Sequence, residues 1–214
     1  IPTYHLKKNN ILDVHKTQLI VSKVSGLEAL NELKIYLKNH RIKSFNNQTE
    51  IKKYKIAYNN QIDSQYKKEF KKIMNYYGNL NFKHKILDYL LERFEIKIKP
   101  KDFYLNRKEI KYLSSLGMII GCHSESHILL SRLNYSTQFN EIKRSKLFLE
   151  KIINKDINTF CYPYGGKISY NNNTLKILKK LKFKLAFSVE HRDIKINDIK
   201  KTPFELPRYD CNLF

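Results

Sequence analysis

The sequence lacks the cysteine spacing of disulfide-rich and zinc-thiolate proteins and the long apolar runs of membrane-spanning proteins. It has no tryptophan, six glycines, five prolines and three cysteines in 214 residues. Cys122, Cys161 and Cys211 show no Cys-x-x-Cys spacing, which argues against a disulfide framework and against a four-thiolate zinc site. A reducing cytoplasm is the simplest fit to this cysteine usage, with the cell envelope as the alternative. No apolar run approaches the ~20 residues that a membrane-spanning helix needs.

Acidic residues are scarce beside basic ones. The chain has 20 Asp and Glu against 41 Lys and Arg, for a net charge of +21. Such a charge is compatible with nucleic-acid binding, but the lysines are spread along the whole chain and do not form one block. We therefore expect no specific nucleic-acid partner, and keep a basic nucleic-acid-binding domain only as an alternative. An anionic surface glycan or a membrane surface is a further candidate partner for so basic a chain.

The hydrophobic pattern divides the chain into two zones. Hydrophobic residues make up 42% of the sequence, which indicates a folded protein. The zone 11–99 is poor in glycine and proline and follows helical periodicity, with Gly26 expected to separate its first two helices. From Asn106 onward short apolar strands alternate with helices, and Asn106 with Glu109 forms a predicted capping box. The expected helices are 11–24, 27–37, 64–76, 82–94, 106–116, 137–153 and 173–181; the expected strands are 118–121, 159–162, 185–189 and 204–206.

Strands alternating with helices predict a parallel α/β sheet or barrel. In such folds the functional loops follow the carboxyl ends of the strands. His123 and His127, four residues apart, come directly after the expected strand 118–121. If the loop turns helically there, both imidazoles share one face and can bind one divalent cation, although this spacing also fits exposed or capping histidines.

Two further segments follow expected strands. Tyr162, Pro163, Tyr164 and Gly165 form a rigid turn that can present the backbone N–H of Tyr164 to a developing oxyanion; the same residues can also be an ordinary turn. The aromatic rings of the turn can stack on sugars or pack in the core. Arg208 follows the last strand and either orients catalytic groups or forms a surface ion pair.

Taken in order, these segments resemble the polysaccharide deacetylases of the NodB-homology type, carbohydrate esterase family 4. The stretch 117–127, ending in His-Ser-Glu-Ser-His, is similar to the family's second motif, whose two histidines bind the metal. Phe160-Cys161-Tyr162-Pro163-Tyr164-Gly165 is similar to its third motif, Phe-Arg-x-Pro-Tyr-Gly, which forms one wall of the groove. The resemblance covers about 106–212, and residues 1–3 look like the end of the strand after the family's first motif.

The resemblance implies a fold, an activity and a set of site residues. The fold is a distorted, incomplete (β/α) barrel, one domain over 1–214 with a helical insertion at 11–99. The activity is metal-dependent hydrolysis that removes N-acetyl or O-acetyl groups from an acetylated amino sugar in surface glycan metabolism. One divalent metal, zinc, is expected on His123 and His127, with Tyr164 as oxyanion donor, Arg208 as an orienting group, and Tyr162, Pro163 and Gly165 contacting substrate.

The sequence departs from the family at three places. The first motif, Thr-Phe-Asp-Asp-Gly, which supplies the catalytic base and third metal ligand, does not occur, and we expect it upstream of Ile1. Cys161 stands where the third motif has arginine. No Leu-x-His general-acid motif is recognisable, and His191 is the only histidine after the third motif. An inactive deacetylase-like carbohydrate-binding protein therefore remains the alternative.

Overall fold

The computed structural model describes residues 1–59 and 61–210. The chain divides into two compact units. The sheet unit contains Ile1–Asn10 and the residues from Phe103 onward, and the helical unit contains Ile11–Asp102. The single domain over 1–214 with an insertion at 11–99 stays a prediction. Within the described residues, none of the helices combines enough length and apolar character to span a bilayer.

The sheet unit is built on a parallel sheet of order β1-β2-β3. Thr159 pairs with Leu185, and Phe187 pairs with Leu206. Cys122 extends the pairing by one isolated parallel bridge to Phe160. This unit consists of α1 (Tyr4–Lys8), α8 (Arg107–Ser115), α9 (Tyr135–Ile153), β1 (Thr159–Cys161), α10 (Asn172–Lys180), β2 (Leu185–Val189), α11 (Ile196–Lys201) and β3 (Leu206–Arg208), with 3-10 turns at Leu130–Arg132 and Lys167–Ser169.

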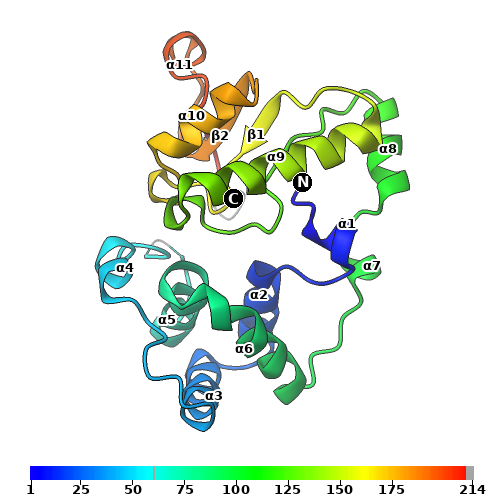
Figure 1. Ribbon diagram of the computed structural model, residues 1–214. Coiled ribbons are helices and arrows are strands. Elements are labelled where there is room, and N and C mark those ends of the chain that lie inside the picture. The colour runs from blue at the N-terminus through cyan, green and yellow to red at the C-terminus, as the bar shows by residue number, and fades with distance from the viewer. Residues whose placement is uncertain (60, 211–214) are drawn as a thin grey trace. The chain divides into compact units, whose positions relative to one another are not determined.

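Apolar faces of the helices cover this sheet. Helix α9 lies beside both α8 and α10 (Figure 1). Phe160 on β1 and Ala186 on β2 are buried in one core with Ile142 and Leu149 of α9 and Ile177 of α10. The α/β class with a parallel sheet is therefore confirmed, whereas closure into a barrel stays a prediction.

The start of α8 confirms the predicted capping box. The Asn106 side chain accepts hydrogen bonds from the backbone N–H groups of Lys108 and Glu109. The Glu109 carboxylate accepts one from the backbone N–H of Asn106 at 2.7 Å. These bonds satisfy donors that the first helical turn otherwise leaves without partners.

Three predicted strands need correction. Residues 118–121 form no strand, and only Cys122 after them pairs with β1, its N–H donating to Thr159 O at 2.9 Å. Met118 and Ile119 are 56% and 84% exposed, so this apolar run lacks the covered faces of a parallel strand. The strand expected at 204–206 lies at Leu206–Arg208 instead, and residues 1–3 form no strand either.

The helical unit is an all-helical bundle in the residues that are described. Its elements are α2 (Asp13–Lys23), α3 (Gly26–Asn39), α4 (Gln48–Lys53), α5 (Gln65–Lys72), a π-helical turn at Ile73–Tyr77 and α6 (Leu80–Arg93), and α7 (Pro100–Phe103) follows them. Gly26 does not separate helices as predicted but is the first residue of α3, capped by Ser25. A Cβ at Gly26 would lie 2.2 Å from the backbone nitrogen of Lys67, so glycine allows α3 to approach α5 closely.

A polar cluster around the buried Lys16 joins α2 to α6. The ammonium of Lys16, whose side chain is 1% exposed, forms an ion pair with Asp88. The Nδ1 atom of His84 lies 2.9 Å from the Asp13 carboxylate, and its Nε2 atom lies 3.3 Å from Asp88. Asp13 and Asp88 therefore compensate the charge of the buried Lys16, whose ammonium also lies 3.4 Å from Nδ1 of His84.

The stability of the helical unit is expected to depend on the protonation of His84. The hydrogen bond to Asp13 raises the pKa of His84 even though burial opposes the rise. The stability that protonated His84 contributes to the folded state is complete below the ordinary histidine pKa of about 6.5, and it is lost as pH rises through the raised pKa. NMR titration of the imidazole proton should show His84 above its ordinary pKa and, because burial lowers the pKa of His15, His15 below it. Asp13→Asn should return His84 toward the ordinary value, and an unchanged His84 pKa in that variant would contradict the assignment.

Candidate active site

A strained turn follows β1 at the carboxyl edge of the sheet. Tyr164 and Gly165 have φ angles of +64° and +77°, the left-handed region. Two backbone hydrogen bonds connect the turn to β2: Tyr162 N–H donates to Phe187 O at 3.2 Å, and Val189 N–H donates to Gly165 O at 2.7 Å. A tyrosine in this conformation costs free energy and persists only where its surroundings enforce it, which is common at functional sites.

The loop 123–127 brings its two histidine rings together without a helical turn. Ser124 and His127 both have positive φ, +58° and +56°, and the buried Ser124 hydroxyl accepts a hydrogen bond from His127 N–H at 3.1 Å. The ring centroids of His123 and His127 are 4.7 Å apart and the ring planes meet at 77°. Two imidazoles on one zinc ion, with metal–nitrogen distances of about 2.1 Å and a near-tetrahedral angle, have centroids about 5 Å apart. The separation therefore fits a shared cation.

A backbone carbonyl orients His123. Its Nδ1 atom lies 2.6 Å from Cys161 O. Because a carbonyl oxygen only accepts, Nδ1 carries the proton and donates, and a neutral imidazole then keeps its lone pair on Nε2. Metal-binding histidines commonly donate their other nitrogen to a carbonyl or carboxylate in this way. The chemistry of His123 therefore also fits a metal ligand.

The histidine pair lies beside the turn after β1. The ring of His127 contacts the ring of Tyr164, with centroids 5.0 Å apart at 69°. The structure thus brings together His123, His127 and Tyr164, the three residues to which the sequence assigns central roles. Among residues 1–59 and 61–210, no group of three or more His, Cys, Asp or Glu side chains could hold a metal. Metal binding by the two imidazoles therefore stays a prediction.

Glu141, on α9, holds the histidine loop. Its carboxylate accepts hydrogen bonds from Ser126 N–H at 2.9 Å, the Ser126 hydroxyl at 2.8 Å and Glu125 N–H at 3.2 Å. Burial raises the pKa of Glu141, and the bonds from Ser126 oppose the rise. Lys7 of α1 adds an ion pair with Glu125 at 2.8 Å. Sequence reasoning missed Glu141 because nothing in a helical pattern marks which polar side chain meets a distant loop.

Replacing Glu141 with alanine is expected to lower the free energy of unfolding by about 2–3 kcal/mol, because it leaves partly buried donors of the loop without an acceptor. Glu141→Gln keeps an acceptor and a similar shape, and should cost less than about 1 kcal/mol. Urea denaturation of both variants measures the difference. Equal losses would show that the carboxylate does not hold the loop by these bonds.

Arg208 lies against the turn. A Cβ built on Gly165 would lie 3.2 Å from its Nη2 atom. Its Nε atom is buried and has no hydrogen-bond partner among the described residues. A buried guanidinium N–H without an acceptor is costly, so the position suits a carboxylate that the described residues do not provide.

The other residues of the predicted site differ in exposure. Tyr162 is fully buried: its ring stacks on Tyr170 with centroids 3.9 Å apart, and its hydroxyl donates to Phe204 O at 2.6 Å. Burial also raises the Tyr162 pKa. Of the two alternatives for its ring, these contacts favour core packing over sugar stacking. Pro163 and Gly165 are buried as well, so any contact they make with substrate would depend on movement or on backbone atoms.

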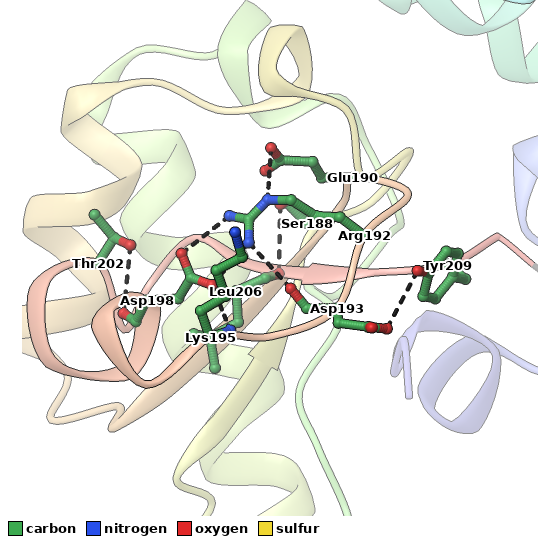
Figure 2. A network of polar contacts seen from close by, with 9 residues as sticks. All are labelled: Ser188, Glu190, Arg192, Asp193, Lys195, Asp198, Thr202, Leu206 and Tyr209. Atoms are coloured by element: carbon green, nitrogen blue, oxygen red, sulfur yellow. Dashed lines mark hydrogen bonds and ion pairs between the residues drawn. The ribbon is translucent and has the colours of Figure 1, made fainter.

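The loop after β2 is braced by an arginine. Figure 2 shows Arg192 between Glu190 and Asp198, with bonds to the two Asp198 oxygens of 2.7 and 3.0 Å. These bonds lower the pKa of Asp198 to about 2. The exposed His191 next to Arg192 lies beside Tyr209, with ring centroids 6.4 Å apart. This loop therefore places His191 near the carboxyl ends of β2 and β3.

Comparison with known proteins identifies the family. The family model for polysaccharide deacetylase matches residues 36–186. No curated protein matches the chain significantly. Solved structures that resemble it include the Streptococcus pyogenes deacetylase PplD in complex with acetate, with 22% identity, a TM-score of 0.46 and coverage of 61% of this chain and 59% of that chain.

Two further solved structures are similar. A polysaccharide deacetylase from Bacillus cereus has 17% identity and a TM-score of 0.45, over 59% of this chain and 43% of that one. A family 4 carbohydrate esterase from Streptomyces lividans in complex with acetate has 17% identity and a TM-score of 0.36, over 45% and 46%. The chain spans about three fifths of the length of the streptococcal deacetylase. Because the family model matches more than half of it, the chain belongs to the polysaccharide deacetylase family.

Proposed function

We propose that the chain belongs to a metal-dependent hydrolase that removes acetyl groups from an acetylated amino sugar. The observation that carries the proposal is the approach of the His123 and His127 rings to 4.7 Å beside the Tyr164 turn. Two nitrogen ligands next to a strained turn are what a hydrolytic metal site needs from this part of the fold. Membership of the deacetylase family supports the reaction class.

The residues of the site would have distinct tasks. His123, oriented by Cys161 O, and His127 would hold the cation. A divalent metal, zinc by preference for nitrogen ligands, would polarise the acetyl carbonyl and lower the pKa of a water molecule. The backbone N–H of Tyr164 would donate to the oxyanion that develops on the acetyl carbonyl oxygen, and its enforced conformation would keep that donor in place.

We further propose that carboxylates supply the third metal ligand and the catalytic base. In residues 1–59 and 61–210, no cluster of three or more His, Cys, Asp or Glu side chains could hold a metal. Arg208, with its buried Nε donor, would position such a carboxylate in place of the arginine that Cys161 replaces. An acceptor of this kind would also remove the cost of burying Nε without a partner.

Acetate release tests the proposal. The protein as encoded in its gene, including any residues before Ile1, is incubated with N-acetylated glucosamine oligosaccharides and zinc, and free acetate is measured. We expect release that His123→Ala reduces at least about 100-fold, since one of the metal ligands is lost. Release that is unchanged in His123→Ala would contradict the proposal.

One observation favours the alternative of a catalytically inactive carbohydrate-binding protein. Cys161 replaces the family's arginine, and the described residues complete no metal site. That alternative predicts retention on acetylated glycan without acetate release under any metal condition. The same assay therefore separates the two functions.

A further inference from the structure

A basic hollow lies on the sheet unit between α8 and α9. Its volume is about 260 Å³. The lining comprises Arg107, Lys108, Lys111, Phe148, Lys151 and Ile152. Four of these six residues are cationic and none is acidic, while Phe148 and Ile152 supply apolar surface.

The charges of the hollow are not balanced by neighbouring acids. None of Arg107, Lys108, Lys111 and Lys151 forms an ion pair with an acidic side chain of the described chain. The acids next to these cations in sequence have other partners: Glu109 caps the start of α8, and Glu150 pairs with Lys146. Four like charges around one concave surface create a positive potential that an anion relieves.

Two cations, Lys7 and Arg107, pack against the Phe148 ring that lines the hollow. The Arg107 guanidinium lies 4.9 Å from the centroid of the Phe148 ring, and the Lys7 ammonium lies 5.1 Å from it. Lys7 is neutralised by Glu125, whereas Arg107 contacts, within the described part of the chain, the Leu6 carbonyl at 3.4 Å and the ring. The guanidinium thus keeps donors for a ligand at the edge of the hollow.

We propose that this hollow binds a phosphate-bearing organic molecule. Several cations with a guanidinium fork favour a doubly charged phosphate over a singly charged carboxylate. The Phe148 and Ile152 side chains provide a surface on which the carbon part of the molecule packs. The hollow shares no residue with the histidine site, so this inference does not rest on the proposed deacetylation.

Binding of two simple probes to the 214-residue chain tests the inference. Dissociation constants for phenyl phosphate and inorganic phosphate are measured by calorimetry at one fixed ionic strength. Phenyl phosphate should bind several-fold more tightly, because its ring adds apolar contact. Lys111→Gln/Lys151→Gln should weaken its binding at least about tenfold, because two charge-assisted contacts are lost.

A matched pair of lysines provides the control. Lys143 and Lys180 lie 5.5 and 5.3 Å from the Phe139 ring, on α9 and α10, and line no part of this hollow. Lys143→Gln/Lys180→Gln removes the same charge and should change the dissociation constant less than about twofold. Equal weakening by both pairs, or equal affinity for the two probes, would overturn the proposal in favour of general attraction to a basic protein. Binding to anionic vesicles but to neither probe would overturn it in favour of a membrane surface.

Discussion

Gly165→Ala is expected to lower the free energy of unfolding by about 2–4 kcal/mol, the sum of a left-handed backbone penalty and overpacking. Gly165 has a φ of +77°, and a Cβ there would lie 2.3 Å from Cγ2 of Val189. Valine cannot move aside easily, because its branched side chain has one preferred rotamer. The added methyl group would push the turn away from β2. This displacement would also strain the hydrogen bond that Val189 N–H donates to Gly165 O.

The adjacent glycine is the control for this prediction. Gly166 has a φ of −68°, and a Cβ built on it meets nothing within 4 Å. Gly166→Ala should therefore change stability by less than about 1 kcal/mol. Urea denaturation compares the two variants, and Gly165→Ala/Val189→Ala shows how much of the loss comes from the methyl contact. Equal stability of the two alanine variants would contradict the described geometry of the turn.

The helices and the parallel strands β1 and β2 could be predicted from the sequence because local signals specify them. The capping pair Asn106 and Glu109 is an example, since both residues act within one helical turn. The apolar run 118–121 misled the prediction: strand formation depends on a partner along the whole run, and only Cys122 pairs with β1. Short helices such as α4 and α11 also escaped prediction, because their residues carry no apolar period.

The candidate site was partly predictable for a similar reason. The Tyr164 turn follows β1, as expected from the rule that functional loops follow parallel strands. The histidine pair follows only the isolated bridge of Cys122, and its loop uses left-handed residues and not the expected helical turn. The hydrogen bonds from Ser126 to Glu141 and the burial of Tyr162 depend on contacts between residues distant in sequence. No local pattern reveals such contacts.

His123→Ala and His127→Ala are each expected to weaken zinc binding by the chain at least about tenfold, because each removes one of two nitrogen ligands. The reason lies in the geometry: the rings approach to 4.7 Å, and Cys161 O fixes the tautomer of His123. His191→Ala removes a histidine from the loop after β2, beside Tyr209, and should leave the affinity unchanged. Circular dichroism of all three variants checks that each remains folded.

Zinc affinity of these variants, measured by competition with a chromophoric chelator, tests the central claim most directly. We predict clear binding by the unmodified chain and by His191→Ala, with a matching loss in His123→Ala and His127→Ala. Undiminished zinc binding in either of the last two folded variants would contradict a metal site shared by these imidazoles.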